Sequence, residues 1–327
     1  MTMPRIVLFS ILFCSQLFGF AQHAKVVGYL PFRAYNSASS IEFCKLTHLN
    51  ISFANPDSNG NFPMLDYSEI IKTAKKQNLG ISIFISMGGG GLQKQAIENW
   101  SQFVDYPQNR ATFISKIMDY VEKNQFDGID FDLEWDAITT GYSDFVVQMK
   151  DSLNEHGKEL SAALPADFRS PNINDKALAC FDFINIMAYD ETGPWKPDRS
   201  GQHSSFEYAK KGIAFWKSQG IPAIKLTLGV PFYGYNFDDK NNVSSFSYSQ
   251  MAETDIANTE IDKVGKAFYN GRPTIGKKVE LAAAEVSGIM IWQIAQDKFD
   301  QYSLLTAIHN KFTALKIKTT GLCGNDF

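Results

Sequence analysis

From Asp127 to Glu134 the chain reads Asp-Gly-Ile-Asp-Phe-Asp-Leu-Glu. This alternation of acidic and large apolar residues is typical of a β-strand, in which successive side chains point to opposite faces. We therefore expect Asp130, Asp132 and Glu134 on one face and the interleaved apolar residues on the other. Three carboxyl groups so close together cannot all ionise cheaply, so at least one keeps its proton at neutral pH. We interpret the segment as a strand of an active site.

The acidic strand is also compatible with two other interpretations. It could be an exposed sheet face, or it could bind Ca²⁺, Mg²⁺ or Mn²⁺, for which carboxylates are suitable ligands. No histidine lies nearby, and Phe126 and Trp135 flank the acidic row. Aromatic rings beside carboxylates favour a sugar or another ring-shaped ligand over a hydrated ion. We therefore expect no metal here.

The first 21 residues have the features of a secretory signal peptide. A short basic start precedes an apolar run over Ile6–Phe13. The segment ends Gly19-Phe20-Ala21, with small residues at the two positions that a signal peptidase recognises. Cys14 could suggest a lipoprotein, but the bulky Phe13 before it argues against a lipobox. We expect cleavage after Ala21, a mature chain of residues 22–327, and a secreted or periplasmic location.

Charge and cysteine content argue against several classes of partner. The formal net charge of −4 and the isoelectric point near 5.8 argue against nucleic acid and against an anionic membrane. No apolar stretch beyond the signal is long enough to span a bilayer. Cys44, Cys180 and Cys323 are widely spaced without a Cys-x-x-Cys pair, so we expect neither a disulfide framework nor a zinc site. Whether these cysteines pair stays open.

The rest of the chain alternates between strand-like and helical patterns. The expected strands are Lys25–Leu30, Thr47–Ala54, Gly80–Met87, Asp127–Glu134, Glu159–Pro165, Phe181–Tyr189, Lys225–Phe232 and Gly288–Ile294. The expected helices are Tyr67–Gln77, Arg110–Asn124, Gly141–His156, Ser205–Gln219, Lys277–Glu285 and Ser303–Leu315. Eight such alternations predict a single α/β domain, and at this length the leading choice is the (β/α)8 TIM barrel. A doubly wound open sheet is second, but no G-x-G-x-x-G follows the first strand.

Several chemically distinctive residues fall at the C-terminal ends of the expected strands. Glu134 ends the fourth, Tyr189 and Asp190 end the sixth, and Trp292 is near the end of the eighth. Active sites of this barrel are built at that face. The pattern therefore predicts that these residues meet.

Five motifs resemble, in the correct order from Lys25 to Asp297, those of glycoside hydrolase family 18. They are Ser86-Met87-Gly88-Gly89, the D-G-x-D-x-D-x-E run of residues 127–134, Met187-Ala188-Tyr189-Asp190, Gly229–Gly234 and Gly288–Trp292. The family comprises chitinases, endo-β-N-acetylglucosaminidases that cut N-glycan cores, and lectin-like members that have lost the catalytic acid. The resemblance implies retaining hydrolysis in which the substrate's own N-acetyl group is the nucleophile, without metal or cofactor.

The resemblance also implies the catalytic roles. Glu134 would protonate the glycosidic oxygen and later activate water, and Asp132 would hold the N-acetyl group and stabilise the resulting oxazolinium. Asp130 would sit beneath Asp132 and tune its charge, and Tyr189 would hydrogen-bond the acetamido carbonyl. The substrate would then be a carbohydrate containing N-acetylglucosamine, which excludes cellulose and starch.

The physical chemistry agrees with these roles. A general acid needs a raised pKa, which Leu133, Trp135 and the neighbouring carboxylates would give Glu134. A positively charged oxazolinium needs a close anion, which Asp132 provides.

The other motif residues could bind substrate or serve the fold. Trp292 resembles the tryptophan under the cleaved sugar, although an inward residue of the eighth strand could also be core. Met187 is expected both to line the site and to pack in the core. Asp190 is expected to contact the substrate, and the alternative is that it caps a loop. Candidate stacking platforms, with packing as the alternative, are Tyr29, Trp135 and Trp195.

Another group is expected to support the site structurally. Ser86, Gly88 and Gly89 would serve the turn after the third strand and the hydrogen bonds under Asp127 and Asp130. Asp127 itself is expected to be a buried hydrogen-bonding anchor. None of the five histidines is expected to be catalytic.

One departure from many family chitinases concerns the segment between strands 7 and 8. Residues 233–287 are too few for a large α+β insertion, and we expect loops and a helix there. This predicts an open groove and endo cleavage of chitin or chitooligosaccharides by a monomer. The alternatives are an endo-β-N-acetylglucosaminidase acting on N-glycans and a non-catalytic lectin on the same barrel.

Overall fold

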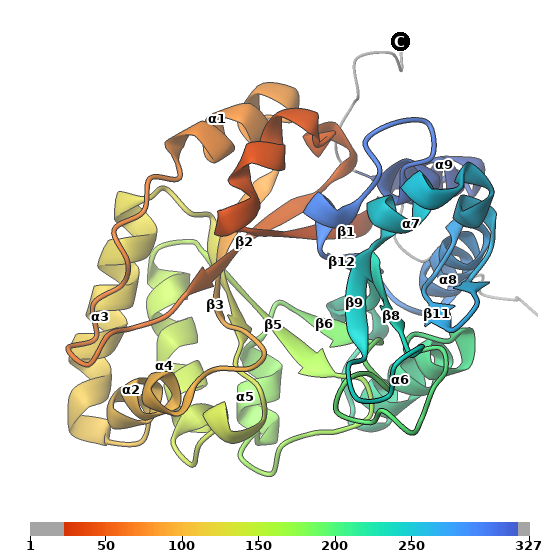
Figure 1. Cartoon of the computed structure of the whole chain (residues 1–327). Helices are drawn as coiled ribbons and strands as arrows, with labels where there is room; N and C mark the ends of the chain where they lie inside the picture. Colours follow the sequence, from red (N-terminus) through yellow and green to blue (C-terminus); the bar gives the residue numbers. More distant parts are fainter. Residues whose placement is uncertain (1–22, 320–327) are drawn as a thin grey trace, which may run out of the picture.

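The computed structural model describes residues 23–319, and a closed barrel of eight parallel strands forms its centre (Figure 1). Consecutive barrel strands are neighbours, and the eighth closes the ring by pairing with the first, with Met290 opposite Val27. The barrel strands are β1 (His23–Pro31), β2 (His48–Ala54), β3 (Ser82–Gly88), β4 (Gly128–Asp132), β5 (Glu159–Pro165), β6 (Phe183–Met187), β7 (Leu226–Pro231) and β12 (Gly288–Trp292). All eight overlap the expected segments, so the TIM barrel is confirmed.

Some expectations fall outside the described part of the chain. The signal peptide over residues 1–21 and Cys323 lie there. Within residues 23–319, Cys180 is a free cysteine and Cys44 takes part in a disulfide bond. No helix in this range is long and apolar enough to cross a membrane. A two-residue strand, β13 (Lys318–Thr319), adds to the start of β1.

Helices surround the barrel on its outer face (Figure 1). They are α1 (Ser68–Gln77), α2 (Lys94–Val104), α3 (Pro107–Lys123), α4 (Tyr142–Glu155), α5 (Asp175–Cys180), α6 (Phe206–Ser218), α8 (Arg272–Glu285) and α9 (Leu304–Ala314). The six expected helices are all present. The sequence missed α2, whose apolar face is confined to a few residues around Trp100, and α5, which is too short for a helical period to be visible.

The core has an outer and an inner layer. Ile129 and Phe131 of β4 belong to the outer layer, between the barrel and the helices. The inner layer fills the barrel and includes Tyr29, Phe84 and Met290. Because β4 is buried on both faces, its alternation does not separate core from solvent. It separates an apolar layer from a polar barrel interior that contains the carboxylates.

The segment between β7 and β12 forms a small antiparallel sheet beside the barrel. Its strands, in the order β10-β11-β8-β9, are β8 (Tyr233–Asn236), β9 (Ser244–Ser247), β10 (Lys263–Val264) and β11 (Ala267–Phe268), and α7 (Tyr248–Thr254) follows β9. A large α+β insertion is therefore absent, as expected. The segment is nevertheless more regular than the expected loops and a helix, because strands of two to four residues depend on pairing partners that local sequence does not specify.

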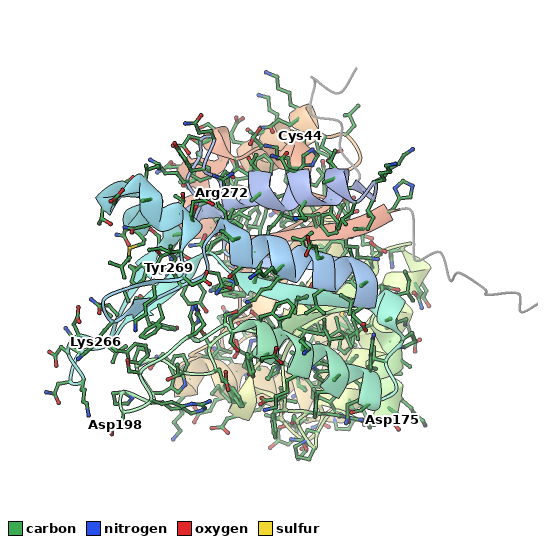
Figure 2. All side chains as sticks on the ribbon, turned by 90° about the vertical axis from the view of Figure 1, so that its right-hand side faces the viewer. Cys44, Asp175, Asp198, Lys266, Tyr269 and Arg272 are labelled. Carbon is green, nitrogen blue, oxygen red and sulfur yellow. The ribbon has the colours of Figure 1, made fainter. Side chains whose placement is uncertain are left out.

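Two features of the fold lie beside this small sheet. On one flank α6, α8 and α9 pack side by side, with α8 in the middle (Figure 2). At the other end the sheet meets the loop after β6, where Lys240 pairs with Asp198 at 2.9 Å. Asp198 and Lys266 project on the same side of the molecule in Figure 2. The small sheet thus forms a wall next to the C-terminal ends of β6 and β7.

Candidate active site

The barrel brings the expected acidic and aromatic residues to one end. Tyr189, just beyond β6, interacts electrostatically with Asp132, Asp190 and Glu134. Glu134 lies two residues beyond the end of β4 and directly precedes a 3-10 turn over residues 135–137. The expected meeting of these chain segments is therefore what the structure shows.

Asp130 lies fully buried inside the barrel and is held by four side chains from four strands. Tyr29 and Ser86 each donate to its Oδ2 at 2.7 Å. Ser161 donates to Oδ1 at 2.6 Å, and Asn185 Nδ2 donates to the same oxygen at 3.3 Å. Burial nevertheless has the larger effect and raises the pKa of Asp130 above its ordinary value.

Asp132 lies two residues after Asp130 on β4 and has fewer hydrogen-bond partners. It is 4% exposed, and within the described residues its Oδ1 accepts no hydrogen bond. Burial, followed by the negative charges of Glu134 and Asp130, raises the pKa of Asp132 well above its ordinary value. A buried carboxyl oxygen without a donor is costly unless a ligand or a proton satisfies it.

Glu134 is only partly buried, and its pKa is raised to about 7. Burial is the first cause and the negative charge of Asp190 is the second. The raised pKa of Glu134 agrees with the expectation from the sequence, and Asp132 of the same strand interacts electrostatically with Glu134 as expected. Two causes differ from the expected ones. Asp190, at the end of β6, adds its negative charge, and a hydrogen bond from Trp135 lowers the pKa of Glu134 instead of raising it.

Asp190 has a left-handed backbone, with φ at +63°, and its carboxylate is the centre of a hydrogen-bond network. Oδ1 accepts hydrogen bonds from the hydroxyls of Tyr233 and Tyr235, the latter at 3.1 Å, and lies 3.2 Å from His203 Nδ1. None of these three residues was expected at the site from the sequence. Tyr233 lies in a quoted motif, whereas nothing local to Tyr235 or His203 indicates the contact.

Tyr189 and Met187 line the same end of the barrel from β6. Tyr189 is 8% exposed, and its hydroxyl points toward Met290 Sδ at 3.8 Å. Burial and then the charge of Asp132 raise the pKa of Tyr189 well above its ordinary value, so the phenol keeps its proton and can donate. Met187 is half-buried against the inner layer, in agreement with its expected position as both wall and core.

Trp292 lies half-buried at the end of β12 with aromatic neighbours on two sides. Its ring stacks on Phe53 with centroids 5.5 Å apart and meets the edge of Tyr29 at 5.6 Å. Tyr29 is only 1% exposed, so the expectation that it forms a sugar-stacking platform was wrong. Its position beneath Trp292 and its hydrogen bond to Asp130 make it a support of the site.

Two other tryptophans have exposed rings. Trp135 is 60% exposed and stacks on Phe168, with centroids 5.8 Å apart. Trp195 is 52% exposed and meets Tyr235 edge to face at the same distance. Both rings are thus accessible for stacking, as a platform requires.

The glycine motif after β3 supports β4. A Cβ on Gly88, whose φ is +111°, would lie 2.5 Å from the carbonyl oxygen of Asp132, so no side chain fits. The amide of Gly89 donates to the same carbonyl at 2.7 Å. Together with the bond from Ser86 to Asp130, these contacts fix the acidic strand from its neighbour.

Asp127 departs from its expected position. It accepts hydrogen bonds from the Ile83 amide at 2.8 Å and from Lys75 at 3.1 Å, which fits an anchor. Its side chain is 42% exposed, however, and it lies before β4, at the end opposite Glu134. The expectation that it is buried, and that the glycine motif hydrogen-bonds beneath it, was therefore wrong.

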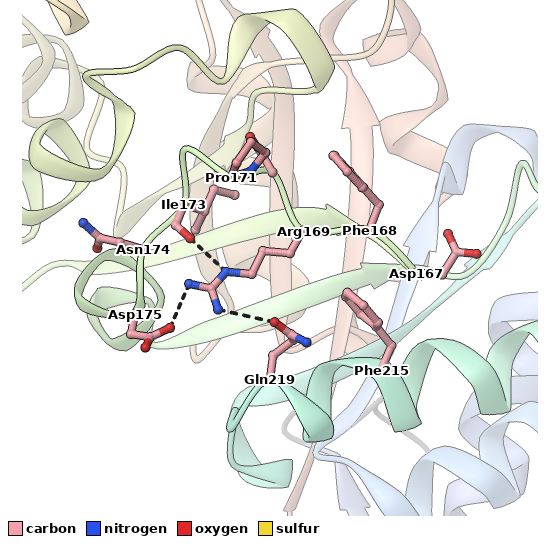
Figure 3. Close-up of a pocket in the computed structure, with 10 residues that line it drawn as sticks. Asp167, Phe168, Arg169, Pro171, Ile173, Asn174, Asp175, Phe215 and Gln219 are labelled. Atoms are coloured by element: carbon pink, nitrogen blue, oxygen red, sulfur yellow. Dashed lines mark hydrogen bonds and ion pairs between the residues drawn. The ribbon is translucent and has the colours of Figure 1, made fainter.

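A cavity of about 600 Å³ lies on the flank of the barrel, between the loop after β5 and the end of α6 (Figure 3). Arg169 spans it and donates to Asp175, Gln219 and the Ile173 carbonyl. Asp130, Asp132, Glu134 and Asp190 do not line this cavity. Among its lining residues, Phe168 connects it to the site, because Phe168 stacks on Trp135.

Within residues 23–319, no group of three histidine, cysteine, aspartate or glutamate side chains is arranged to hold a metal ion. The site combines carboxyl groups whose pKa values are raised with neighbouring aromatic side chains.

Known proteins resemble this chain in sequence and in fold. The family model of the glycosyl hydrolases family 18 matches residues 25–297. The crystal structure of the GH18 chitinase ChiB from the chitin utilization locus of Flavobacterium johnsoniae superposes with a TM-score of 0.92 at 52% identity, covering 93% of this chain and 99% of that one.

More distant relatives extend the comparison. The class V chitinase CHIT5 of Lotus japonicus is 24% identical over 83% of this chain and 82% of its own length. Probable chitinase 10 of Drosophila melanogaster is 22% identical over 76% of this chain, which spans only 14% of that protein's length. Since the family model covers most of the chain, the protein belongs to glycosyl hydrolase family 18 and is a glycosidase of the chitinase type.

Proposed function

We propose that this protein is an exported, monomeric, endo-acting hydrolase of β-1,4-linked N-acetylglucosamine polymers and oligomers. The observation that carries the proposal is the row of Asp130, Asp132 and Glu134. It combines a proton donor whose pKa is about 7 with a buried Asp132 oxygen that accepts no hydrogen bond from the described residues. A substrate with a 2-acetamido group would supply the missing donor through its N–H.

In the first step the acetamido sugar rests against Trp292 and its N–H donates to Asp132. Glu134 gives its proton to the glycosidic oxygen as the bond from that oxygen to the anomeric carbon breaks. The acetamido carbonyl oxygen attacks the same carbon and forms a cyclic oxazolinium. The positive charge of this intermediate is stabilised by the Asp132 carboxylate, while Tyr189 donates a hydrogen bond to the acetamido carbonyl.

In the second step Glu134, now ionised, accepts a proton from a water molecule. The oxygen of that water attacks the anomeric carbon from the face that the leaving group vacated, and the bond to the acetamido oxygen breaks. The sugar therefore keeps its configuration and Glu134 recovers its proton, so no group is consumed. The four donors to Asp130 support this cycle by holding the Asp130 carboxyl group in place next to Asp132 on the same strand.

Chitin is favoured over other acetamido sugars for two reasons. The relative with 52% identity carries the name chitinase and is attributed to a chitin utilization locus. In this chain the exposed rings of Trp135 and Trp195 offer stacking faces for further sugars of a linear chain. The short segment between β7 and β12 leaves a low wall, which supports cleavage within chains.

The experiment is mass spectrometry of the products formed by the mature protein from two substrates. One is a hexamer of N-acetylglucosamine and the other is an N-glycosylated protein. Dimers and tetramers from the hexamer, with the glycoprotein intact, are the expected result. A single N-acetylglucosamine left on asparagine would instead make the protein an endoglycosidase of N-glycans. Binding of the hexamer without any product would reject the hydrolase proposal in favour of a lectin.

A further inference from the structure

His203 lies in the loop between β6 and α6, a polar segment, and yet its side chain is completely buried. Burying an imidazole is costly unless its nitrogens find hydrogen-bond partners. The mechanism proposed above does not use this residue. Its partners therefore indicate what it does.

Both ring nitrogens face oxygen acceptors from other elements. Nδ1 lies 3.2 Å from Asp190 Oδ1, and Nε2 lies 3.2 Å from the carbonyl oxygen of Tyr233. The Asp190 amide also donates a hydrogen bond to Nδ1 at 3.4 Å, so His203 contacts both the backbone and the carboxylate of Asp190. The ring contacts those of Tyr233 and Tyr235, with centroids 5.0 and 4.9 Å apart. His203 thus joins the end of β6 to the small sheet.

Ser204, the residue after His203, holds this part of the loop in place through hydrogen bonds. Ser204 donates to the Ala188 carbonyl at 2.6 Å, immediately before Tyr189. Lys278, buried on α8, donates to both the hydroxyl and the carbonyl of Ser204 at 2.7 Å, and to Asn270 at the same distance. The backbone of residues 203–204 is therefore anchored from β6 on one side and from α8 on the other.

Asp190 needs such support. Its left-handed backbone is disfavoured for a residue with a side chain, so tertiary contacts must hold it. The direction of its carboxylate matters because this charge acts on Glu134. We propose that His203 is a positioning residue of the hydrolysis, which holds the Asp190 carboxylate beside the proton donor Glu134. This inference rests on the function proposed above.

The charged groups near His203 either contact it directly or form interactions with other residues. From the end of β6 it faces Asp190, and from β8 it faces the hydroxyl-bearing rings of Tyr233 and Tyr235. From α8, Lys278 reaches Ser204, and within the loop Glu191 pairs with Arg199 at 2.7 Å. Asp190 is therefore the group through which a change at His203 would reach Glu134.

Two substitutions separate the contacts of the two ring nitrogens. An asparagine amide falls near the position of Nδ1 and can still donate to Asp190, whereas a glutamine amide falls near Nε2 and can still donate to the Tyr233 carbonyl. We would measure kcat and KM of His203→Asn and His203→Gln on a chitooligosaccharide from pH 4 to 9, together with their melting temperatures.

The glutamine variant is expected to lose about tenfold in kcat, the effect of one hydrogen bond, with KM within about twofold. The basic limb of its kcat profile should move to lower pH, on the order of half a pH unit, because Asp190 then acts less on Glu134. The asparagine variant should recover both properties. An unmoved profile, or equal losses in both variants, would overturn the inference by making His203 merely structural. A shift to higher pH would also overturn it, since His203 would then neutralise Asp190.

A double substitution tests whether His203 acts on Glu134 through Asp190. In an Asp190→Asn background, His203→Gln should leave the pH profile where it is, because its route to Glu134 is already removed. A further displacement there would contradict the inference. Wild-type protein in the same assay separates the two proposals. Without wild-type turnover the proposed function and this inference fail together, whereas wild-type turnover with an unmoved His203→Gln profile rejects this inference alone.

Discussion

For its individual residues, the site depends on carboxyl groups whose ionised form is disfavoured by burial. Asp130, Asp132 and Glu134 all have raised pKa values, and burial is the leading cause for each. Only Asp130 has a full set of donors within the described residues. The row therefore combines one anchored carboxylate with two that respond to a ligand, and this combination suits transfer of a single proton.

Replacing Glu134 by glutamine removes the proton while keeping the shape of the side chain. We expect Glu134→Gln to lower kcat by roughly three orders of magnitude or more, with little change in affinity for a chitooligosaccharide. Steady-state kinetics and calorimetric titration with the hexamer would measure the two effects. Turnover close to that of the wild type would contradict the assignment of Glu134 as the acid.

The pH dependence of turnover follows from the same group. A general acid must be protonated, and the pKa of Glu134 is about 7 in the free protein. We therefore expect kcat/KM to be sustained below pH 7 and to fall tenfold per pH unit well above it. Rates measured in buffers of constant ionic strength would test this. A basic limb near pH 5 would mean that neither burial nor Asp190 acts on Glu134 as inferred.

At the element scale, the close approach of β3 and β4 fixes the acidic strand. Gly88 permits it, since any Cβ there would collide with the Asp132 carbonyl. Because the sequence shows a Ser-Met-Gly-Gly run, a turn after the third strand was predictable. The collision that requires the glycine was not, since it involves a residue 44 positions away on β4.

A pair of alanine substitutions in this loop tests that contact. Gly88→Ala should reduce kcat more than about tenfold, because moving Asp132 misplaces the acetamido group. Gly91→Ala is the control. It has the same left-handed backbone, at φ +74°, but nothing within 4 Å of the added carbon. It should cost about 1 kcal/mol of stability and leave kcat unchanged. Urea unfolding and kinetics on both variants would measure this, and equal losses of kcat would contradict the contact.

At the scale of the whole molecule, the site reduces the stability of the barrel that holds it. The pKa of Glu134 is about 7 in the folded chain and ordinarily 4.5, so the folded state binds more protons between these values. Stability is therefore lost as the pH rises from about 4.5 to 7 and then changes no further on account of this group.

Glu134→Gln should therefore be more stable than the wild type above pH 7. The gap should close toward pH 4 and reach at most about 3 kcal/mol, since the side chain is only partly buried. Urea unfolding of both proteins at pH 4.5 and pH 8 would show this. Glu155→Gln, at the exposed end of α4, is the matched control and should show no such dependence on pH. A gap that is constant with pH would contradict the raised pKa.

Local periodicity, together with motifs whose residues are close in the chain, predicts the barrel, the acidic row and the ends of β6 and β12. Three features depend on tertiary contacts instead. They are the action of the Asp190 charge on Glu134, the burial of Tyr29 against Asp130 and Trp292, and the contact of His203 with both the end of β6 and the small sheet. The hydrogen bonds among these contacts connect residues from 13 to 101 positions apart. Barrel closure brings such residues together, and no local pattern encodes which of them meet.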